Sequence, residues 1–259
     1  FGSDDERPFV LTVPSVLTVL VVHGPDRPVD PLAGRGGWRY LAETLAPGGQ
    51  DGIFRVEDVA SGELTSGHLS ASTVVVFVDP EPLGRRMSDA LRLWLENGGV
   101  AAFLVGEPTL AGYLDSALLP LLGLTSGVEA VSLPAGQHQR ARVLDAGHPI
   151  FAGLGSEAII TFEDITWNRW LKVPAGEAGI VLELADESPL LLTGVLGEGR
   201  FVFMPCNMLP SSGKIAVSPM ALPFFQRMVS WLATGGLRSA AVNTDVGQRA
   251  SIIPVPGTS

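Results

Sequence analysis

The sequence contains one cysteine, Cys206, which is the first candidate for nucleophilic chemistry. A cysteine attacks as a thiolate, so it needs an adjacent imidazole, a cation or a helix N-terminus that lowers its pKa. The nearest histidine along the chain, His148, is far from Cys206 in sequence. Free cysteine is otherwise among the most buried residue types and packs like a small apolar side chain. We therefore predict a packing role for Cys206, at the end of the apolar run FVFMPC.

Three carboxylates that follow apolar, strand-like runs are the second candidate. Asp79 and Glu81 come after TVVVFV, and Glu107 comes after VAAFLV. Ligands of open α/β sheets bind at the carboxyl ends of the strands, so these side chains could meet there for acid–base chemistry or to hold a divalent metal. The alternative is that they cap helices and line solvated strand ends. We favour this alternative, because no histidine or glycine-rich motif reinforces the cluster.

The four histidines do not indicate a metal centre. His23 follows the first strand-like run and would lie at the same sheet edge, although a turn residue at a strand end is the simpler role. None of the four, His23, His68, His138 and His148, stands at the i, i+4 spacing that places two imidazoles on one helix face. We predict no metal site and no cofactor.

Two further motifs suggest binding but fit simpler interpretations. GRGG, at residues 34–37, precedes a helix but lacks the lysine and spacing of a P-loop and does not fit the dinucleotide fingerprint. TWNRW, at residues 166–170, could mark an exposed aromatic patch for a partner or a sugar. We predict a loop for the first motif and core or edge packing for the second.

The composition indicates a folded, acidic protein. Hydrophobic residues make up 46% of the 259 residues, which suits one large or two small domains. The formal charge of −10 argues against nucleic acid and against an anionic membrane surface, because affinity for phosphates comes largely from Lys and Arg. The longest apolar run, residues 11–22, is interrupted by Pro14 and is too short to span a bilayer. We predict no membrane insertion by this segment, and we expect the chain to be a piece of a longer protein.

The first half of the chain alternates between strand-like and helix-like segments. The sequence predicts strands over residues 16–22, 53–59, 73–78 and 100–105, and helices over residues 38–45, 83–97 and 109–122. Strands that are buried on both faces of a parallel sheet read as continuous apolar runs, as three of these do. Strands alternating with helices predict a doubly wound, mostly parallel, flavodoxin-like α/β sheet with right-handed crossovers.

The second half reads differently from about residue 127 onward. Short candidate strands follow one another closely, over residues 159–162, 180–184, 190–196 and 200–204. Gly197-Glu198-Gly199 reads as a tight turn between the last two. These segments predict antiparallel strands added to the edge of the parallel sheet. We expect a final helix that either follows Pro219 or begins near Pro223. We favour the second start, since proline suits the first turn of a helix but not its interior.

The order of these elements, with the segments ALRLWLENGGVAAFLVGEPT and GVLGEGRFVFMPCN, resembles the class I glutamine amidotransferase-like domain of bacterial aerotolerance-regulator-like membrane proteins, which often carry a von Willebrand factor A domain. The resemblance covers residues 4–236. It implies a soluble, extracytoplasmic domain of a membrane-anchored protein, with other domains or subunits of that complex as partners. On this basis residues 16–236 form the amidotransferase-like domain. Residues 1–15 would be the tail of a preceding β-module or a lead-in strand, and residues 237–259 a linker into a further module.

The resemblance also shows what the chain lacks. Class I amidotransferases use a cysteine on a strand-to-helix elbow, a histidine after a later strand and a nearby acid. The elbow position falls at Gly106 and Glu107 and the histidine position at residues 205–207, and neither catalytic residue is present. We therefore predict no catalytic residue, no enzyme activity and an interaction or structural role. The alternative is a ligand-binding or hydrolytic domain that uses the acidic strand ends on a sugar-like or amide ligand.

Overall fold

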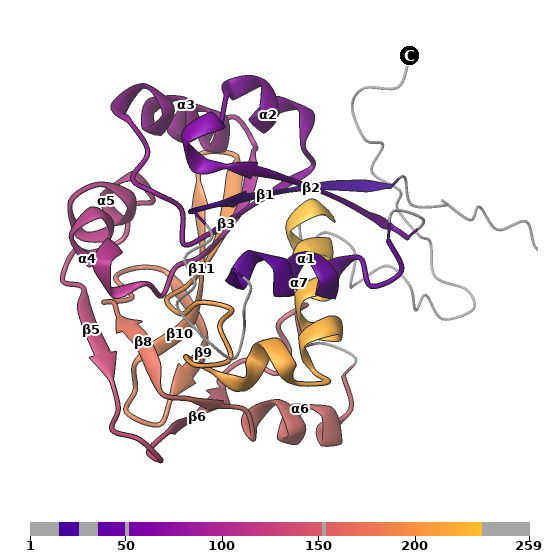
Figure 1. Ribbon diagram of the computed structural model, residues 1–259, viewed down its shortest axis with the longest axis vertical. Helices are drawn as coiled ribbons and strands as arrows, with labels where there is room; N and C mark the ends of the chain where they lie inside the picture. Colours follow the sequence, from indigo (N-terminus) through magenta and orange to yellow (C-terminus); the bar gives the residue numbers. More distant parts are fainter. Residues whose placement is uncertain (1–15, 26–35, 50–51, 152–153, 235–259) are drawn as a thin grey trace, which may run out of the picture.

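The computed structural model describes residues 16–25, 36–49, 52–151 and 154–234 (Figure 1). The predicted flanking segments, residues 1–15 and 237–259, lie outside the described residues, as do Gly34 and Arg35 of the GRGG motif. Most of the strands form one nine-stranded sheet, in the order β2-β1-β3-β4-β11-β10-β9-β6-β7.

The first five strands of this sheet are parallel. They are β2 (Phe54–Ala60), β1 (Leu17–His23), β3 (Val74–Val78), β4 (Val100–Leu104) and β11 (Gly199–Met204). Every residue of β3 is buried, because helices cover both faces of the sheet. The continuous apolar runs of the sequence therefore correspond to central strands, and the predicted doubly wound sheet is confirmed.

The remaining strands pair antiparallel and extend the sheet beyond β11. They are β10 (Pro189–Leu196), β9 (Gly179–Leu184), β6 (Gln139–Val143) and β7 (Thr166–Trp167), and a separate two-stranded sheet joins β5 (Glu129–Ser132) to β8 (Arg169–Lys172). The predicted turn at Gly197 is present. Gly197 has a φ of +62°, and a Cβ there would lie 2.4 Å from the carbonyl oxygen of Glu96, so the position requires glycine.

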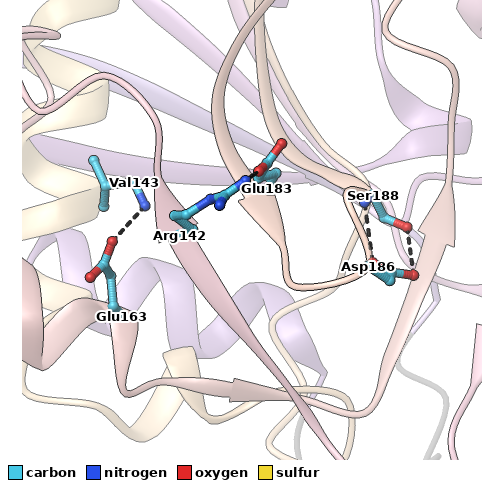
Figure 2. Close-up of polar contacts among 6 residues, drawn as sticks. All are labelled: Arg142, Val143, Glu163, Glu183, Asp186 and Ser188. Carbon is cyan, nitrogen blue, oxygen red and sulfur yellow. Dashed lines mark hydrogen bonds and ion pairs between the residues drawn. The ribbon is translucent and has the colours of Figure 1, made fainter.

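Side chains support the antiparallel part at two places (Figure 2). Arg142 on β6 pairs with the largely buried Glu183 on β9. In the turn between β9 and β10, the carboxylate of Asp186 accepts hydrogen bonds from the backbone N–H of Ser188 at 3.1 Å and from its hydroxyl at 2.9 Å. Ser188 is fully buried, so its polar groups need these partners.

Helices form a layer on each face of the sheet. On one face lie α1 (Gly37–Leu45), α6 (Ser156–Glu163) and α7 (Ala221–Thr234), and on the other α2 (Ser66–Ala71), α3 (Arg85–Glu96), α4 (Ala111–Tyr113) and α5 (Leu119–Leu121). Short turns of other helix types are η1 (Ser61–Glu63), η2 (Pro108–Leu110), η3 (Leu114–Leu118) and η4 (Lys214–Val217). None of the helices in the described part of the chain is both long and apolar enough to cross a membrane.

The strand predicted over residues 159–162 is wrong, because these residues lie within helix α6. Short apolar runs fit a strand and a buried helix equally well, and the choice depends on what they pack against. Here Phe162 is fully buried in the core, and the carboxylate of Glu163 accepts a hydrogen bond from the backbone N–H of Val143 at 2.8 Å (Figure 2). The neighbouring strand thus fixes the end of the helix.

The helix predicted over residues 109–122 is present but irregular. It begins as η2, passes through α4, widens to a π-helical stretch in η3 and ends as α5. Pro120 has no N–H to donate to the preceding turn, so the regular hydrogen-bond ladder is interrupted ahead of it. Strands β5 to β8 and helix α2 are short, and the sequence analysis did not predict them.

Candidate functional site

The chain reverses its direction of winding across the sheet at strand β1. Strand β2 lies on one side of β1 and β3 on the other, so the carboxyl ends of β1 and β3 flank a topological switch point. Open α/β sheets bind ligands at such points. A cavity of about 120 Å³ lies here, and the residues that matter for its chemistry are Gly24, Gly37, Trp38, Asp79, Glu81 and Glu107. We refer to it as the switch-point pocket.

Asp79 connects three strands at this edge. It directly follows β3, and its backbone N–H donates to the carbonyl of Leu104 at 3.0 Å. Its carboxylate oxygen Oδ1 accepts hydrogen bonds from the backbone N–H groups of Gly106 at 2.8 Å and Glu107 at 2.9 Å. The side chain of Asn207, after β11, also donates to this carboxylate. Asp79 therefore joins the end of β3 to the turns after β4 and β11.

The environment of Asp79 favours its neutral form more than water does. The pKa of the carboxyl group is raised to about 6, chiefly by burial and in part by the nearby charge of Glu107. The hydrogen bonds from Gly106, Glu107 and Asn207 act in the opposite direction and limit the rise. The residue as a whole keeps some exposed surface, but the carboxyl group itself is enclosed. Asp79 is thus ionised at neutral pH and takes up a proton in mildly acidic solution.

The other two carboxylates line the same cavity but do not converge on one point. Glu107 caps the short helix η2, where its Oε1 accepts from the hydroxyl of Thr109 at 3.1 Å. Glu81 is exposed, and its backbone N–H donates to the hydroxyl of Ser61 at 3.0 Å. Within the described ranges, no three His, Cys, Asp or Glu side chains are placed to hold a metal ion together. The structure thus brings the three predicted carboxylates to one cavity and gives two of them capping or bridging roles.

His23 lies behind the pocket wall rather than in the cavity. Its ring stacks on Trp38 with a centroid distance of 4.2 Å and an interplanar angle of 10°. Its Nδ1 lies 2.6 Å from the carbonyl oxygen of Gly24, and its Nε2 lies 3.5 Å from a carboxylate oxygen of Asp58. These contacts position Trp38, which does line the pocket.

Two residues of the site were missed by sequence reasoning, Trp38 and Ser61. The hydroxyl of Ser61 donates to the carbonyl of His23 at 2.6 Å and accepts from the N–H of Glu81, so it joins the two walls of the pocket. Nothing local in the sequence marks Ser61 for this role. The place of Trp38 in the pocket wall could have been predicted. The helix that contains it follows β1, so its first residues must lie at the carboxyl edge of the sheet.

At the elbow position after β4, Gly106 has no room for a side chain, whereas the next residue, Glu107, carries a carboxylate that lines the pocket. A Cβ at Gly106 would lie 2.3 Å from the backbone nitrogen of Asn207 and 2.6 Å from the carbonyl carbon of Cys206. Close packing of the turn after β11 therefore requires glycine here. The two successive N–H groups of this turn, which could hold an oxyanion, are directed at the carboxylate of Asp79 instead.

Cys206 is buried, with 1% of its surface exposed, as the packing interpretation predicts. The pKa of its thiol is raised to about 12, chiefly by burial and in small part by the charge of Asp79. The indole N–H of Trp167 lies near enough to lower the pKa of the thiol, although it makes no hydrogen bond of good geometry within the described part of the chain. A thiol with this pKa is protonated at neutral pH and is a poor nucleophile.

The tryptophans of the TWNRW motif do not form a surface patch. Trp167 is fully buried and Trp170 is 1% exposed, so the predicted packing role is confirmed for both. Within the described residues, the indole nitrogens of both side chains lack a hydrogen-bond partner.

Comparisons with known proteins establish the fold. The sequence matches no known protein family and no curated protein. Two solved structures from Salmonella typhimurium, both described as cytoplasmic proteins, are similar to it with TM-scores of 0.63 and 0.65 and 15% identity, covering 83% of this chain and 99% of those chains. A ThuA-like protein from Bacteroides uniformis is similar with a TM-score of 0.58 and 12% identity, covering 88% of this chain and 95% of that chain. The chain therefore shares the flavodoxin-like α/β fold of these proteins, with a mostly parallel sheet extended by antiparallel strands.

Proposed function

We propose that this chain is a non-catalytic amidotransferase-like domain that serves as an interaction or structural module. Support comes chiefly from the turn after β4, where the backbone of Cys206 and Asn207 fills the place that a nucleophilic side chain at residue 106 would need. The N–H groups of that turn are already bonded to Asp79. Cys206, the only thiol, is buried and protonated.

Glutaminase activity is the direct test. Purified protein is incubated with glutamine, and release of ammonia is followed for the wild type and for Cys206→Ser. We expect both proteins to match the buffer control, because neither has an accessible thiolate. Release of ammonia by the wild type that is lost in Cys206→Ser would overturn the proposal.

A second candidate function is favoured by the switch-point pocket. Trp38 offers an aromatic surface, and Glu81 and Glu107 offer acceptors for hydroxyl or amide N–H groups, which suits a small sugar-like or amide ligand. We favour binding over hydrolysis, because the carboxylates of Asp79 and Glu107 are already hydrogen-bonded within the protein.

Thermal unfolding in the presence of candidate ligands tests this second function, since a ligand that binds only the native state raises the melting temperature. Monosaccharides and small amides at millimolar concentration are the probes. A stabilising ligand should lose its effect in Trp38→Ala and keep it in Glu157→Gln, a matched change of an exposed glutamate on α6. Equal stabilisation of both variants would place the binding elsewhere and reject the pocket.

The cellular context is also a proposal. From the sequence resemblance we infer a soluble domain of a membrane-anchored bacterial protein, facing the outside of the membrane, with other domains or subunits of the complex as partners. Fractionation of cells that express the full-length reading frame tests this. Recovery of the intact protein in the soluble fraction would contradict it.

A further inference from the structure

Asp79 is held in an unusual backbone conformation next to the switch-point pocket. Its φ is +41°, in the left-handed region that non-glycine residues rarely adopt and that aspartate tolerates better than most. The carbonyl oxygen of Asp79 packs closely against Gly24, the residue that follows β1. A Cβ at Gly24 would lie 2.4 Å from this oxygen. The backbone of Asp79 is therefore fixed, and its interactions can change only through the side chain.

The side chain of Asp79 holds the turn that forms one wall of the pocket. The N–H groups of Gly106 and Glu107 share one carboxylate oxygen, and Glu107, Thr109 and Leu110 of this turn line the cavity. Hydrogen bonds to an ionised acceptor are roughly twice as strong as those to a neutral one. The strength of this attachment therefore depends on whether Asp79 carries a proton.

We propose that Asp79 is a proton-controlled latch, which in its ionised form holds the turn of residues 106–110 against the pocket and in its neutral form loosens it. The latch depends neither on the identity of a ligand nor on catalysis. It makes the geometry of one pocket wall respond to pH.

The groups around Asp79 set the range in which the latch works. Glu107 is the charged group that faces it from the turn after β4, and Asn207 and the protonated thiol of Cys206 face it from the turn after β11. The turn after β1 presents the backbone of Gly24, and His23 at the end of β1 lies beside Asp58. Glu81, on the same loop as Asp79, is exposed. Burial and Glu107 together bring the pKa of Asp79 to about 6, so the latch changes state in mildly acidic solution.

Amide hydrogen exchange of the whole chain tests the latch. Protection factors of the Gly106 and Glu107 amides, corrected for intrinsic exchange, are measured from about pH 7.5 to about pH 5. We expect both to fall about fivefold as Asp79 becomes neutral, while core amides remote from this turn lose no protection. Unchanged protection of Gly106 and Glu107 in the wild type would overturn the proposal.

Two variants identify the group responsible. Asp79→Asn imitates the neutral carboxyl, so its Gly106 and Glu107 amides should show the low-pH protection at every pH. Glu81→Gln removes a neighbouring carboxylate that makes no contact with these amides, so it should keep the wild-type response. Loss of the response in Glu81→Gln would assign the titration to another group and reject the latch. If Asp79→Asn does not fold, the wild type and Glu81→Gln still decide the question.

Discussion

Gly106 shows at the scale of one residue why this turn differs from a catalytic elbow. Any side chain at this position would meet the backbone after β11 rather than the pocket. Backbone atoms move less readily than a flexible side chain, so the crowding cannot be relieved locally. The same contact that brings β4 and β11 together at the sheet edge therefore requires glycine at residue 106, while the side chain of the next residue, Glu107, lines the pocket.

We expect Gly106→Ala to lower the free energy of unfolding by about 1–3 kcal/mol, because the added methyl group forces the two turns apart. Urea unfolding followed by circular dichroism measures the change. Gly112→Ala is the matched control, since a Cβ there meets nothing within 4 Å and alanine favours the helix by up to about 1 kcal/mol. Equal stability of Gly106→Ala and wild type would show that the turns can separate without cost.

Asp79 should also affect global stability, in a direction opposite to that of most carboxylates. Its pKa in the folded state, about 6, is above the ordinary value of 3.8, so the native protein holds the proton more tightly than the unfolded chain does. The resulting stabilisation is complete below the ordinary pKa and is lost as the pH rises through 6. Mild acid thus favours the native fold through Asp79 while it loosens the turn after β4.

We expect wild-type protein to lose about 2–3 kcal/mol relative to Asp79→Asn between about pH 4 and pH 7.5, because only the wild type must bury a carboxylate. Urea unfolding of both proteins across this range measures the difference, and Glu81→Gln serves as control. If the free energy of unfolding depended on pH in the same way in the wild type and in Asp79→Asn, the carboxylate of Asp79 would not be buried as described.

At the scale of elements, a turn at His148 anchors the final helix to the core. The ring of His148 lies 4.8 Å from that of Trp231 on α7, and its Nδ1 accepts a hydrogen bond from the N–H of Ile150 at 3.3 Å. Arg227, also on α7, donates to the carbonyl of Ile150 at 2.8 Å. Helix α7 is thus tied to the chain that precedes α6.

Acid should weaken this anchor. Burial lowers the pKa of His148, and Asp145 opposes the effect, so the native state favours the neutral ring. Stability from the neutral ring is present above the ordinary pKa and is lost as the pH falls through the lowered value. We expect His148→Asn, which keeps an acceptor for Ile150, to lose less stability than the wild type on acidification from about pH 7 to about pH 5. A larger loss in the variant, measured by thermal unfolding, would reject this role.

At the scale of the whole molecule, the single nine-stranded sheet joins the parallel and antiparallel parts. Strand β11 is the junction, since it pairs with β4 on one side and β10 on the other. Cys206 lies two residues beyond this strand and is buried in the core. Access of a reagent to this thiol therefore shows whether the end of β11, where the parallel and antiparallel parts meet, has separated from the core.

We expect the described domain to unfold as one unit, because neither part has a core that is separate from the shared sheet. Labelling of Cys206 by a thiol reagent and loss of circular dichroism should then share one midpoint in urea. Denatured protein provides the reference for full labelling. Rapid labelling of the native protein, or labelling before the loss of secondary structure, would show that β11 can open independently.

The sequence by itself determined the central architecture. Continuous apolar runs rich in β-branched residues, such as residues 73–78, favour a strand buried on both faces. Glycines at residues 98–99 mark the end of the preceding helix by local sterics alone. The sequence alone also shows that neither a cysteine nor a histidine stands at the positions where the resemblance to class I amidotransferases would place the catalytic pair.

Only the tertiary structure decided what depends on contacts between distant residues. Residues 159–162 form a helix because of what they pack against. Asp79 binds Gly106 and Glu107, and Ser61 binds His23, because parallel strands bring their carboxyl ends together from separate parts of the chain. Local sequence carries no signal for such contacts, since their energy arises from burial and geometry that exist only after the sheet has formed.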